Sequence, residues 1–523
     1  MVCSRFTSGG SLLRPIIVAL LAALAAGSVS APATATSRAP ANPAPPRTGE
    51  GALFDAFRKA NAAVQAKDWS TVYSTLKGIL DGEALAAQPA QIRHSVLSTF
   101  ALSAILTDHP AEALAAAKQA CEMPEAQSSD WRLRAFAAWQ AKDGLDLADT
   151  IATLGERWPD ELRSLGYQQI FGMHMQVSQA ARASDALAKF DAALFVAGWQ
   201  PESAADRPDS FWVEYAGILL DRGDVAAARK VAGQITMPNE IVQMRSDKRF
   251  DVIVQRDNPA FDPRRAAEAD VERLSQAVKA APDSLDLLLG LVTAKRRLGQ
   301  NEAAMTLVEG ALAKIKAQGA SAFSDTEEKS NWLYDLQARL LLDSGKVDEA
   351  LAIQTKGAAL KEEGGDNTSQ VLNLGSQYVG MNRPKEALAA IVKVGGMSTF
   401  GEMVRLYVDG CARAQLGETT AVQADLAEMR KRWPVNADAL QGLLICANDL
   451  DAAAKVLIQR LDDPQERASI LRDIQDYRDR AYYPPQTKLN IERTRQILKR
   501  PDVQAAIAKY GRIESYDLLP VDT

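Results

Sequence analysis

The sequence predicts an all-α protein built from antiparallel helix pairs, because of one complete pair, a recurring spacing of small residues and the lack of strand-like alternation. Residues 331–360 show the pair most clearly, since Ala338 and Ala350 lie twelve positions apart on either side of Gly345. In an antiparallel pair this spacing places two methyl groups opposite each other, so the backbones can approach closely. Alternation of apolar and polar residues is hard to find anywhere.

The same spacing recurs around other turns. Each of three further turns contains Gly, Asn-Arg-Pro or Asp-His-Pro and is flanked by small residues twelve positions apart. The flanking pairs are Ala101 and Ala113, Ala216 and Ala228, and Gly375 and Ala387. We therefore expect several helix pairs of one kind.

One pair also carries larger residues at fixed offsets. Trp212, Ala216, Leu219, Gly223 and Ala228 supply aromatic, small, large, glycine and alanine positions in turn. This pattern resembles the tetratricopeptide repeat, a helix pair of about 34 residues. The resemblance implies a right-handed superhelical solenoid whose concave groove, lined by the first helix of each pair, holds a protein or peptide partner.

The alanine of the second helix recurs along the chain. These anchors are Ala113, Ala148, Ala186, Ala228, Ala304, Ala350, Ala387 and Ala453. The interval before Ala304 accommodates a degenerate repeat near residues 270–282, and Val422 is a weaker anchor. A chain of 523 residues is too long for one compact core, which also favours an array.

Composition excludes one class of partner. The chain is 47% hydrophobic but only 6% aromatic, which suits thin, closely packed helices. Its formal net charge is −6. Binding to nucleic acid regardless of sequence needs a basic footprint, so we expect no nucleic-acid partner.

Residues 1–35 have the layout of a secretory signal peptide. Arg5 and Arg14 supply the positive region, and the apolar run Pro15–Ala26 is too short to span a bilayer comfortably. An uncleaved membrane anchor is the alternative. The Ala- and Pro-rich segment 36–50 is predicted to be a disordered linker. We therefore expect a periplasmic or secreted protein of a Gram-negative-like bacterium, with membrane contact only through an uncleaved signal.

The remainder divides into four predicted parts. Residues 51–238 form an N-terminal array, 239–263 a connector helix, 264–464 a C-terminal array, and 465–523 a helical cap with a loose tail. Solenoids need a polar outer face on their terminal units, which the charged and aromatic cap supplies.

The connector breaks the repeat rhythm and contains a cluster of charges. Arg245, Lys248, Arg249 and Arg256 alternate with acidic residues, and we interpret them as a solvated face. A grafted functional insertion is the alternative, because loops of repeat proteins often carry binding contacts.

The triplet Arg-Trp-Pro ends two predicted helices, at residues 157–159 and 432–434. Proline cannot extend a helix, and the aromatic side chain before it can pack under the next hairpin. We interpret Trp158 and Trp433 as helix-end packing, with a ligand contact as the alternative.

Catalytic and metal-binding signatures are absent from the sequence. His94, His109 and His174 lie far apart and, with the cysteines, show no zinc spacing. No glycine-rich phosphate loop and no GxSxG motif occurs, and the adjacent acidic pairs do not face one cleft. We expect no metal, no cofactor and no enzymatic activity.

Three cysteines follow the predicted signal. Cys411 and Cys446 fall on the first helices of successive repeats, and Cys121 lies in an earlier repeat. We expect buried free thiols, which behave as small apolar groups. The alternative is a bridge between Cys411 and Cys446, which requires their Cα atoms to lie within roughly 7 Å.

The register of the clearest repeats selects residues for the partner groove. Arg296, Arg297, Asp335, Arg339 and Tyr407 are predicted to face it. Arginines there suit bidentate pairing with a partner's carboxylate. The alternative is that these residues only keep the surface soluble.

The sequence thus predicts an exported, non-catalytic interaction scaffold. One rival is a periplasmic solute- or glycan-binding solenoid, with Trp332 and Tyr407 as candidate groove aromatics. Another is a hydrolase whose site is not recognisable from sequence. The sequence selects neither the partner nor an oligomeric state.

Overall fold

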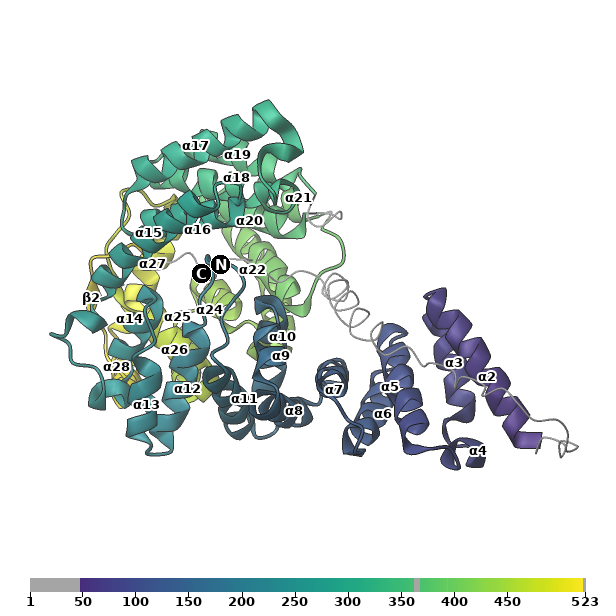
Figure 1. The fold of residues 1–523 in the computed structure, drawn as a ribbon. Coiled ribbons are helices and arrows are strands. Elements are labelled where there is room, and N and C mark those ends of the chain that lie inside the picture. Colours follow the sequence, from purple (N-terminus) through teal and green to yellow (C-terminus); the bar gives the residue numbers. More distant parts are fainter. Residues whose placement is uncertain (1–47, 362–366, 393, 521–523) are drawn as a thin grey trace, which may run out of the picture. The chain divides into compact units, whose positions relative to one another are not determined.

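The computed structural model describes residues 48–361, 367–392 and 394–520, and these ranges are almost entirely helical (Figure 1). Consecutive helices pack as antiparallel pairs, which confirms the predicted all-α class built from helix pairs. The predicted signal peptide 1–35 and most of the linker 36–50 lie outside the described residues. Within the described ranges, no helix has both the length and the apolar character needed to cross a membrane.

The chain divides into two compact units, with the boundary between Glu202 and Ser203. The N-terminal unit contains α2 Thr48–Gln65, α3 Trp69–Leu80, α4 Glu83–Ala86, α5 Ala90–Leu106, α6 Pro110–Glu122, α7 Ser128–Gln140, α8 Gly144–Arg157, α9 Pro159–Arg163, α10 Tyr167–Ser178 and α11 Ala183–Ala197. The boundary lies earlier in the chain than the connector predicted at 239–263, because helices after Ser203 pack with the C-terminal part of the chain.

The C-terminal unit is the larger of the two. Its helices are α12 Asp209–Asp221, α13 Val225–Ala232, α14 Pro238–Ser246, η1 Lys248–Val252, η2 Pro259–Phe261, α15 Pro263–Ala280, α16 Leu285–Arg297, α17 Asn301–Gln318, η3 Gly319–Ala322, α18 Thr326–Asp343, α19 Val347–Ala358, α20 Thr368–Gly380, α21 Pro384–Ile391, α22 Thr399–Leu416, α23 Thr419–Lys431, η4 Trp433–Val435, α24 Ala437–Cys446, α25 Leu450–Asp462, α26 Pro464–Asp473, α27 Pro485–Leu498 and α28 Pro501–Tyr510. Its two strands are β1 Asp476–Tyr477 and β2 Ser515–Tyr516, which pair in parallel.

Small residues at the hairpin crossings let the helices approach closely, as the sequence predicts. Ala338 of α18 and Ala350 of α19 are fully buried in one apolar cluster with Leu341. A Cβ at Gly375 of α20 would lie 2.9 Å from Ile391 of α21. Larger residues at these positions would therefore force the two helices apart.

Most turns within the hairpins share one backbone geometry; the turn between α10 and α11, at residues 179–182, does not. A single residue adopts the left-handed conformation, and in five of these turns it is not glycine. The turn residues are Lys67, Asp108, Lys142, Gly223, Gly299, Gly345, Asn382, Gly417 and Asn448. The next N–H then bonds back to a carbonyl near the end of the first helix, for example Lys346 N to Leu341 O at 2.9 Å. This hydrogen bond satisfies a helix-end acceptor and fixes the angle between the helices.

The predicted connector is more broken than one helix. α14 occupies only its first part, and two short 3₁₀ turns carry the chain to α15. The prediction that its basic residues form a solvated face holds for the exposed Lys248 and Arg256 but is wrong for Arg245 and Arg249. Arg245 and Arg256 both pair with Glu514, at 2.9 and 2.8 Å, and Arg249 pairs with the buried Asp247 at 2.7 Å.

The C-terminal unit closes on itself through its last helices. α26 packs against α14, as Figure 1 shows, and Asp247 forms an antiparallel bridge with Gly511. Leu519 N donates to Arg297 O at 2.9 Å, which joins the end of the chain to α16. The first and last helices of this unit are therefore neighbours, although they are far apart in sequence.

The segment after α26 runs along the turns of the hairpins. Tyr482 contacts the turn at Gly345, and Arg493 donates to Ile445 O at 2.8 Å. The expectation of a loose tail is wrong for residues 515–520, because Leu518 is only 2% exposed. Apolar burial against α15 and α16 holds it in place.

Cys411 and Cys446 form a disulfide between α22 and α24, with a Cα–Cα distance of 5.5 Å. The expectation of free thiols is wrong for this pair, because neighbouring first helices approach within bridging distance. Cys121 is a buried free thiol, and burial raises its pKa to about 12.

Candidate interaction site on the C-terminal unit

Arg296, predicted to face the groove, is engaged within the chain. It forms a bidentate ion pair from α16 with Asp343 of α18, at 2.6 and 3.0 Å, and Arg480 reaches the same carboxylate at 3.3 Å. All three side chains are largely buried. Arg296 therefore ties two first helices to the C-terminal segment.

Asp335 and Arg339 form a second polar contact along α18. Their side chains pair at 2.6 Å, and Asn373 of α20 donates to the other Asp335 oxygen at 3.2 Å. Tyr407 on α22 is half-buried, and burial raises its pKa. Asp335 and Arg339 share α18 and Tyr407 lies two first helices further on, and no hydrogen bond or ion pair joins any of them to Arg297 among the described residues.

Arg297 lies in a different group, where the unit closes. Its guanidinium donates to the side chain of Asn239 at 2.5 Å. Electrostatic interactions connect it with Glu240, Arg472 and Tyr477. We call Glu240, Arg297, Arg472, Asp473 and Tyr477 the closure cluster.

The fold places Glu240 in the first turn of α14. Asp209 of α12 accepts hydrogen bonds from the backbone N–H groups of Thr236 and Met237, at 2.5 and 2.7 Å, and so fixes the entry to this helix. Ile241 on the same helix is buried in the core. Helix position and core packing together determine where the Glu240 carboxyl lies.

The opposite charges of the closure cluster are desolvated but poorly paired. No other described residue donates a hydrogen bond to the Glu240 side chain or forms an ion pair with it. The nearest charged contact of Arg472 is its neighbour in sequence, Asp473, at 3.2 Å. Arg297 forms no ion pair with a described residue. The residues concerned are all half-buried: Glu240, Arg297, Arg472 and Asp473.

The pKa values of Glu240, Arg297 and Asp473 reflect the burial of their charges. Burial raises the pKa of Glu240, and the positive charges of Arg472 and Arg297 offset this only in part. Burial also lowers the pKa of Arg297 and raises that of Asp473. Desolvation thus disfavours the charged forms of Glu240, Arg297 and Asp473, as at sites where a ligand supplies the missing partner. For Arg472, desolvation is outweighed by the charges of Asp473 and Glu240, which raise the pKa.

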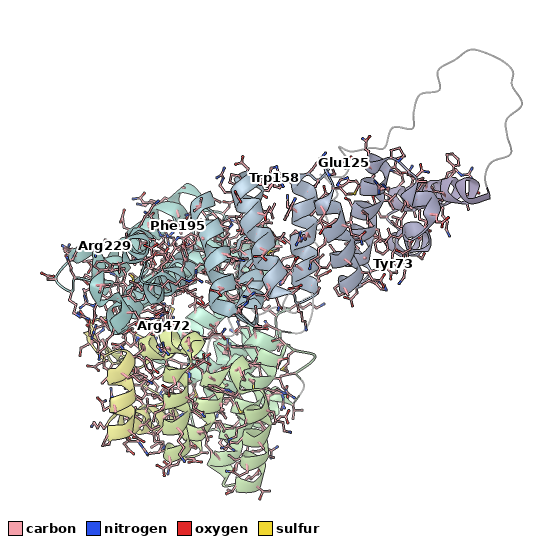
Figure 2. All side chains as sticks on the ribbon, turned by 90° about the horizontal axis from the view of Figure 1, so that it is seen from below. Tyr73, Glu125, Trp158, Phe195, Arg229 and Arg472 are labelled. Carbon is pink, nitrogen blue, oxygen red and sulfur yellow. A yellow bond between two sulfur atoms is a disulfide. The ribbon has the colours of Figure 1, made fainter. Side chains whose placement is uncertain are left out.

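The closure cluster joins distant parts of the chain. Figure 2 labels Arg472 where the yellow helices meet the teal helices at the start of this unit. Tyr477 follows on β1, and its hydroxyl donates to Arg472 O at 3.0 Å. No pattern in the sequence points to Glu240, Arg472, Asp473 or Tyr477, because only the closure of the unit brings them together.

The histidines do not form a site. His94 lies 3.0 Å from Asp130, His109 stacks on Tyr73 and His174 lies 3.3 Å from Asp191. Among the described residues, no group of three or more His, Cys, Asp or Glu side chains is placed to hold a metal ion.

The pair of carboxyl groups formed by Asp409 of α22 and Asp425 of α23 was also not predicted from the sequence. Burial and the charge of Asp409 raise the pKa of Asp425 to about 7. Gly410 permits this approach, since a Cβ there would lie 3.3 Å from an Asp425 carboxylate oxygen. Arg413 holds Asp409 at 2.7 Å, so one proton shared by the two carboxyls is the expected state near neutral pH.

No protein-family model matches the sequence, and no curated protein matches it. Two solved structures show likeness in fold. One is a tetratricopeptide repeat protein from Parabacteroides merdae ATCC 43184, with a TM-score of 0.31 and 11% identity over 68% of this chain and 98% of that one. The other is the APC/C hetero-tetramer Cut9-Hcn1, with a TM-score of 0.28 and 14% identity over 87% and 95%. Both TM-scores are low, so the fold assignment rests on the helix pairs themselves.

Proposed function

We propose that the protein is an exported, non-catalytic scaffold that binds a polypeptide partner, with the closure cluster as its main recognition site. The observation that carries this proposal is that neither Glu240 nor Arg297 forms a direct ion pair within the part of the chain that the structure describes. Desolvated charges without a direct counter-charge reduce stability, so a fold that keeps them has a use for them.

A polypeptide fits this cluster because it offers both kinds of partner. Backbone and side-chain donors would satisfy Glu240, while carboxylate or carbonyl oxygens would accept from Arg297 and Arg472. A ligand of one charge would leave the opposite charge of the cluster unpaired. Arg296, Asp335 and Arg339 then serve to align the first helices, and Tyr407 remains a candidate contact on the predicted groove.

Export is supported by two independent features. The first 35 residues have the charge and apolar pattern of a signal peptide. The disulfide between Cys411 and Cys446 suits an oxidising compartment, since such bonds are rare in the cytosol. We therefore propose a periplasmic or secreted location.

The test is a pull-down from envelope extract with the chain from Thr36 onward. The test variant combines Glu240→Gln with Arg472→Gln. The matched control combines Asp462→Asn with Lys509→Gln, an exposed acid and base that pair on the surface at 3.1 Å. We expect one dominant protein to be captured by the wild type and the control, and lost from the test variant.

Three results would overturn the proposal. Equal capture by the test variant would exclude the closure cluster as the recognition site. If no protein is retained by any form, a solute- or glycan-binding solenoid would replace the scaffold, and screening of glycans would follow. Turnover of an extract component by the purified chain would instead favour the alternative hypothesis that the protein is a hydrolase.

A further inference from the structure

A cavity of about 390 Å³ lies between α23, α24 and α25. Leu440 and Leu444 of α24 are buried and form its apolar floor, and Trp433 forms one side. Arg430 and Lys455 stand at its mouth on the two flanking helices. This volume accommodates a few large side chains but not a whole helix.

The cavity arises where the second Arg-Trp-Pro triplet departs from the first. Trp158 packs against Trp131, with ring centroids 6.5 Å apart, and Arg157 covers it at 4.2 Å. Trp433 is half-buried like Trp158 and also packs against the core of its unit, but it borders the cavity. Helix-end packing therefore fits both tryptophans, and only Trp433 is also placed for a ligand contact.

The mouth of the cavity carries positive charge that the chain does not neutralise. Arg430 and Lys455 are exposed, and neither forms an ion pair with a described residue. The nearby Glu428 is already engaged, because it pairs with Lys431 at 2.9 Å and with Arg432 at 2.6 Å. An anionic ligand therefore meets two cations without displacing an internal partner.

We propose that this cavity binds a short acidic segment of a polypeptide, with one large apolar side chain on Leu440, Leu444 and Trp433 and a neighbouring carboxylate between Arg430 and Lys455. An apolar anchor in a pocket with a charged rim is the usual arrangement of a peptide-binding hot spot. This surface is separate from the closure cluster, so the inference goes beyond the proposed function and does not depend on it.

Isothermal titration calorimetry with defined peptides tests the inference on the chain from Thr36 onward. The probe is acetyl-Asp-Leu-Phe-Asp-Leu-amide, and the comparison peptides carry Asn or Lys in place of both Asp residues. We expect the acidic peptide to bind at least tenfold more tightly than the Asn peptide, and the Lys peptide not to bind. Added salt should weaken the binding of the acidic peptide.

Variants locate the binding. Arg430→Glu and Lys455→Glu lie on the surface and should each reduce affinity for the acidic peptide at least tenfold. Lys385→Glu makes the same charge change at another exposed position and should leave affinity unchanged. Ala452→Trp fills the cavity without altering charge and should abolish binding.

Three outcomes would overturn the inference: no binding of the acidic peptide, equal binding of all three peptides, or binding that survives Arg430→Glu and Lys455→Glu. The variant with Glu240→Gln and Arg472→Gln should bind the acidic peptide normally. Failure of this inference is therefore distinguishable from failure of the proposed function.

Discussion

The disulfide between Cys411 and Cys446 offers the most quantitative prediction. The two residues are 35 positions apart, and closing a loop of this length in the unfolded chain removes conformational entropy worth about 4 kcal/mol at 25 °C. Disulfides typically contribute about 2–4 kcal/mol, so we expect reduction of this bond to cost an amount in that range. The loss should be concentrated in the part of the solenoid that contains α22 and α24.

The assay combines mass spectrometry with hydrogen exchange. Without reductant, the chain from Thr36 onward should show one alkylatable thiol after denaturation, that of Cys121. The double variant Cys411→Ala with Cys446→Ala should exchange amide hydrogens faster in α22–α24, by a factor that corresponds to the predicted loss. Cys121→Ala is the matched control and should keep the protection of these helices.

Either of two results would refute this reasoning. Three alkylatable thiols in protein purified from the envelope would show that the bridge does not form there. Unchanged exchange in the double variant would show that the bond adds no stability to these helices. The first result would also remove one of the two supports for export.

The remaining predictions concern backbone, charge and closure. Gly345→Ala should destabilise the folded protein by about 1–2 kcal/mol, because φ at this residue is +74°. Asn382→Gly, at the equivalent turn position, should be neutral or stabilising. Urea unfolding measures the stability of both variants. With a pKa of about 7, folded Asp425 holds a proton that the unfolded chain releases above about pH 4, so stability falls from pH 4 to pH 7. Asp425→Asn should therefore stabilise by about 1 kcal/mol at pH 8 and by nearly nothing at pH 4. Arg245→Ala removes a largely buried partner of Glu514 and should cost about 1–3 kcal/mol, seen as faster proteolysis of the C-terminal segment.

Each of these predictions has a contradicting result. Equal stability of the two turn variants would mean that the left-handed conformation is not maintained in solution. A gain for Asp425→Asn that does not change with pH would exclude the shared proton. Unchanged proteolysis after Arg245→Ala would show that closure of the C-terminal unit does not depend on the ion pair.

Local features were predictable from the sequence. Ala338, Gly345 and Ala350 lie within one hairpin, so spacing alone determines which groups meet.

Contacts between distant segments were not predictable. The repeat register gave the helix face of Arg296 and Asp335 but not their partners, Asp343 and Asn373, which come from neighbouring first helices. Glu240, like the rest of the closure cluster, meets its neighbours only because the last helices return to the first. No repeat pattern encodes that return, since each repeat contacts mainly its neighbours.

Cysteine pairing shows the same limit at shorter range. One repeat separates Cys411 from Cys446, and the sequence correctly placed both on first helices. Whether two such helices come within bridging distance depends on the angle between repeats. The sequence therefore left two possibilities, buried free thiols and a disulfide. The Cα–Cα distance of 5.5 Å selects the disulfide.

The most direct test of the central claim is site-specific photo-crosslinking in the cells that produce the protein. The substitution Tyr477→p-benzoyl-L-phenylalanine places the probe in the closure cluster, and Tyr510→p-benzoyl-L-phenylalanine is the matched control, since the Tyr510 hydroxyl pairs with the exposed Asp462 at 2.6 Å. We expect a discrete crosslinked protein from position 477 and none from position 510. Crosslinks from neither position, or the same crosslink from both, would contradict recognition of a partner at the closure cluster.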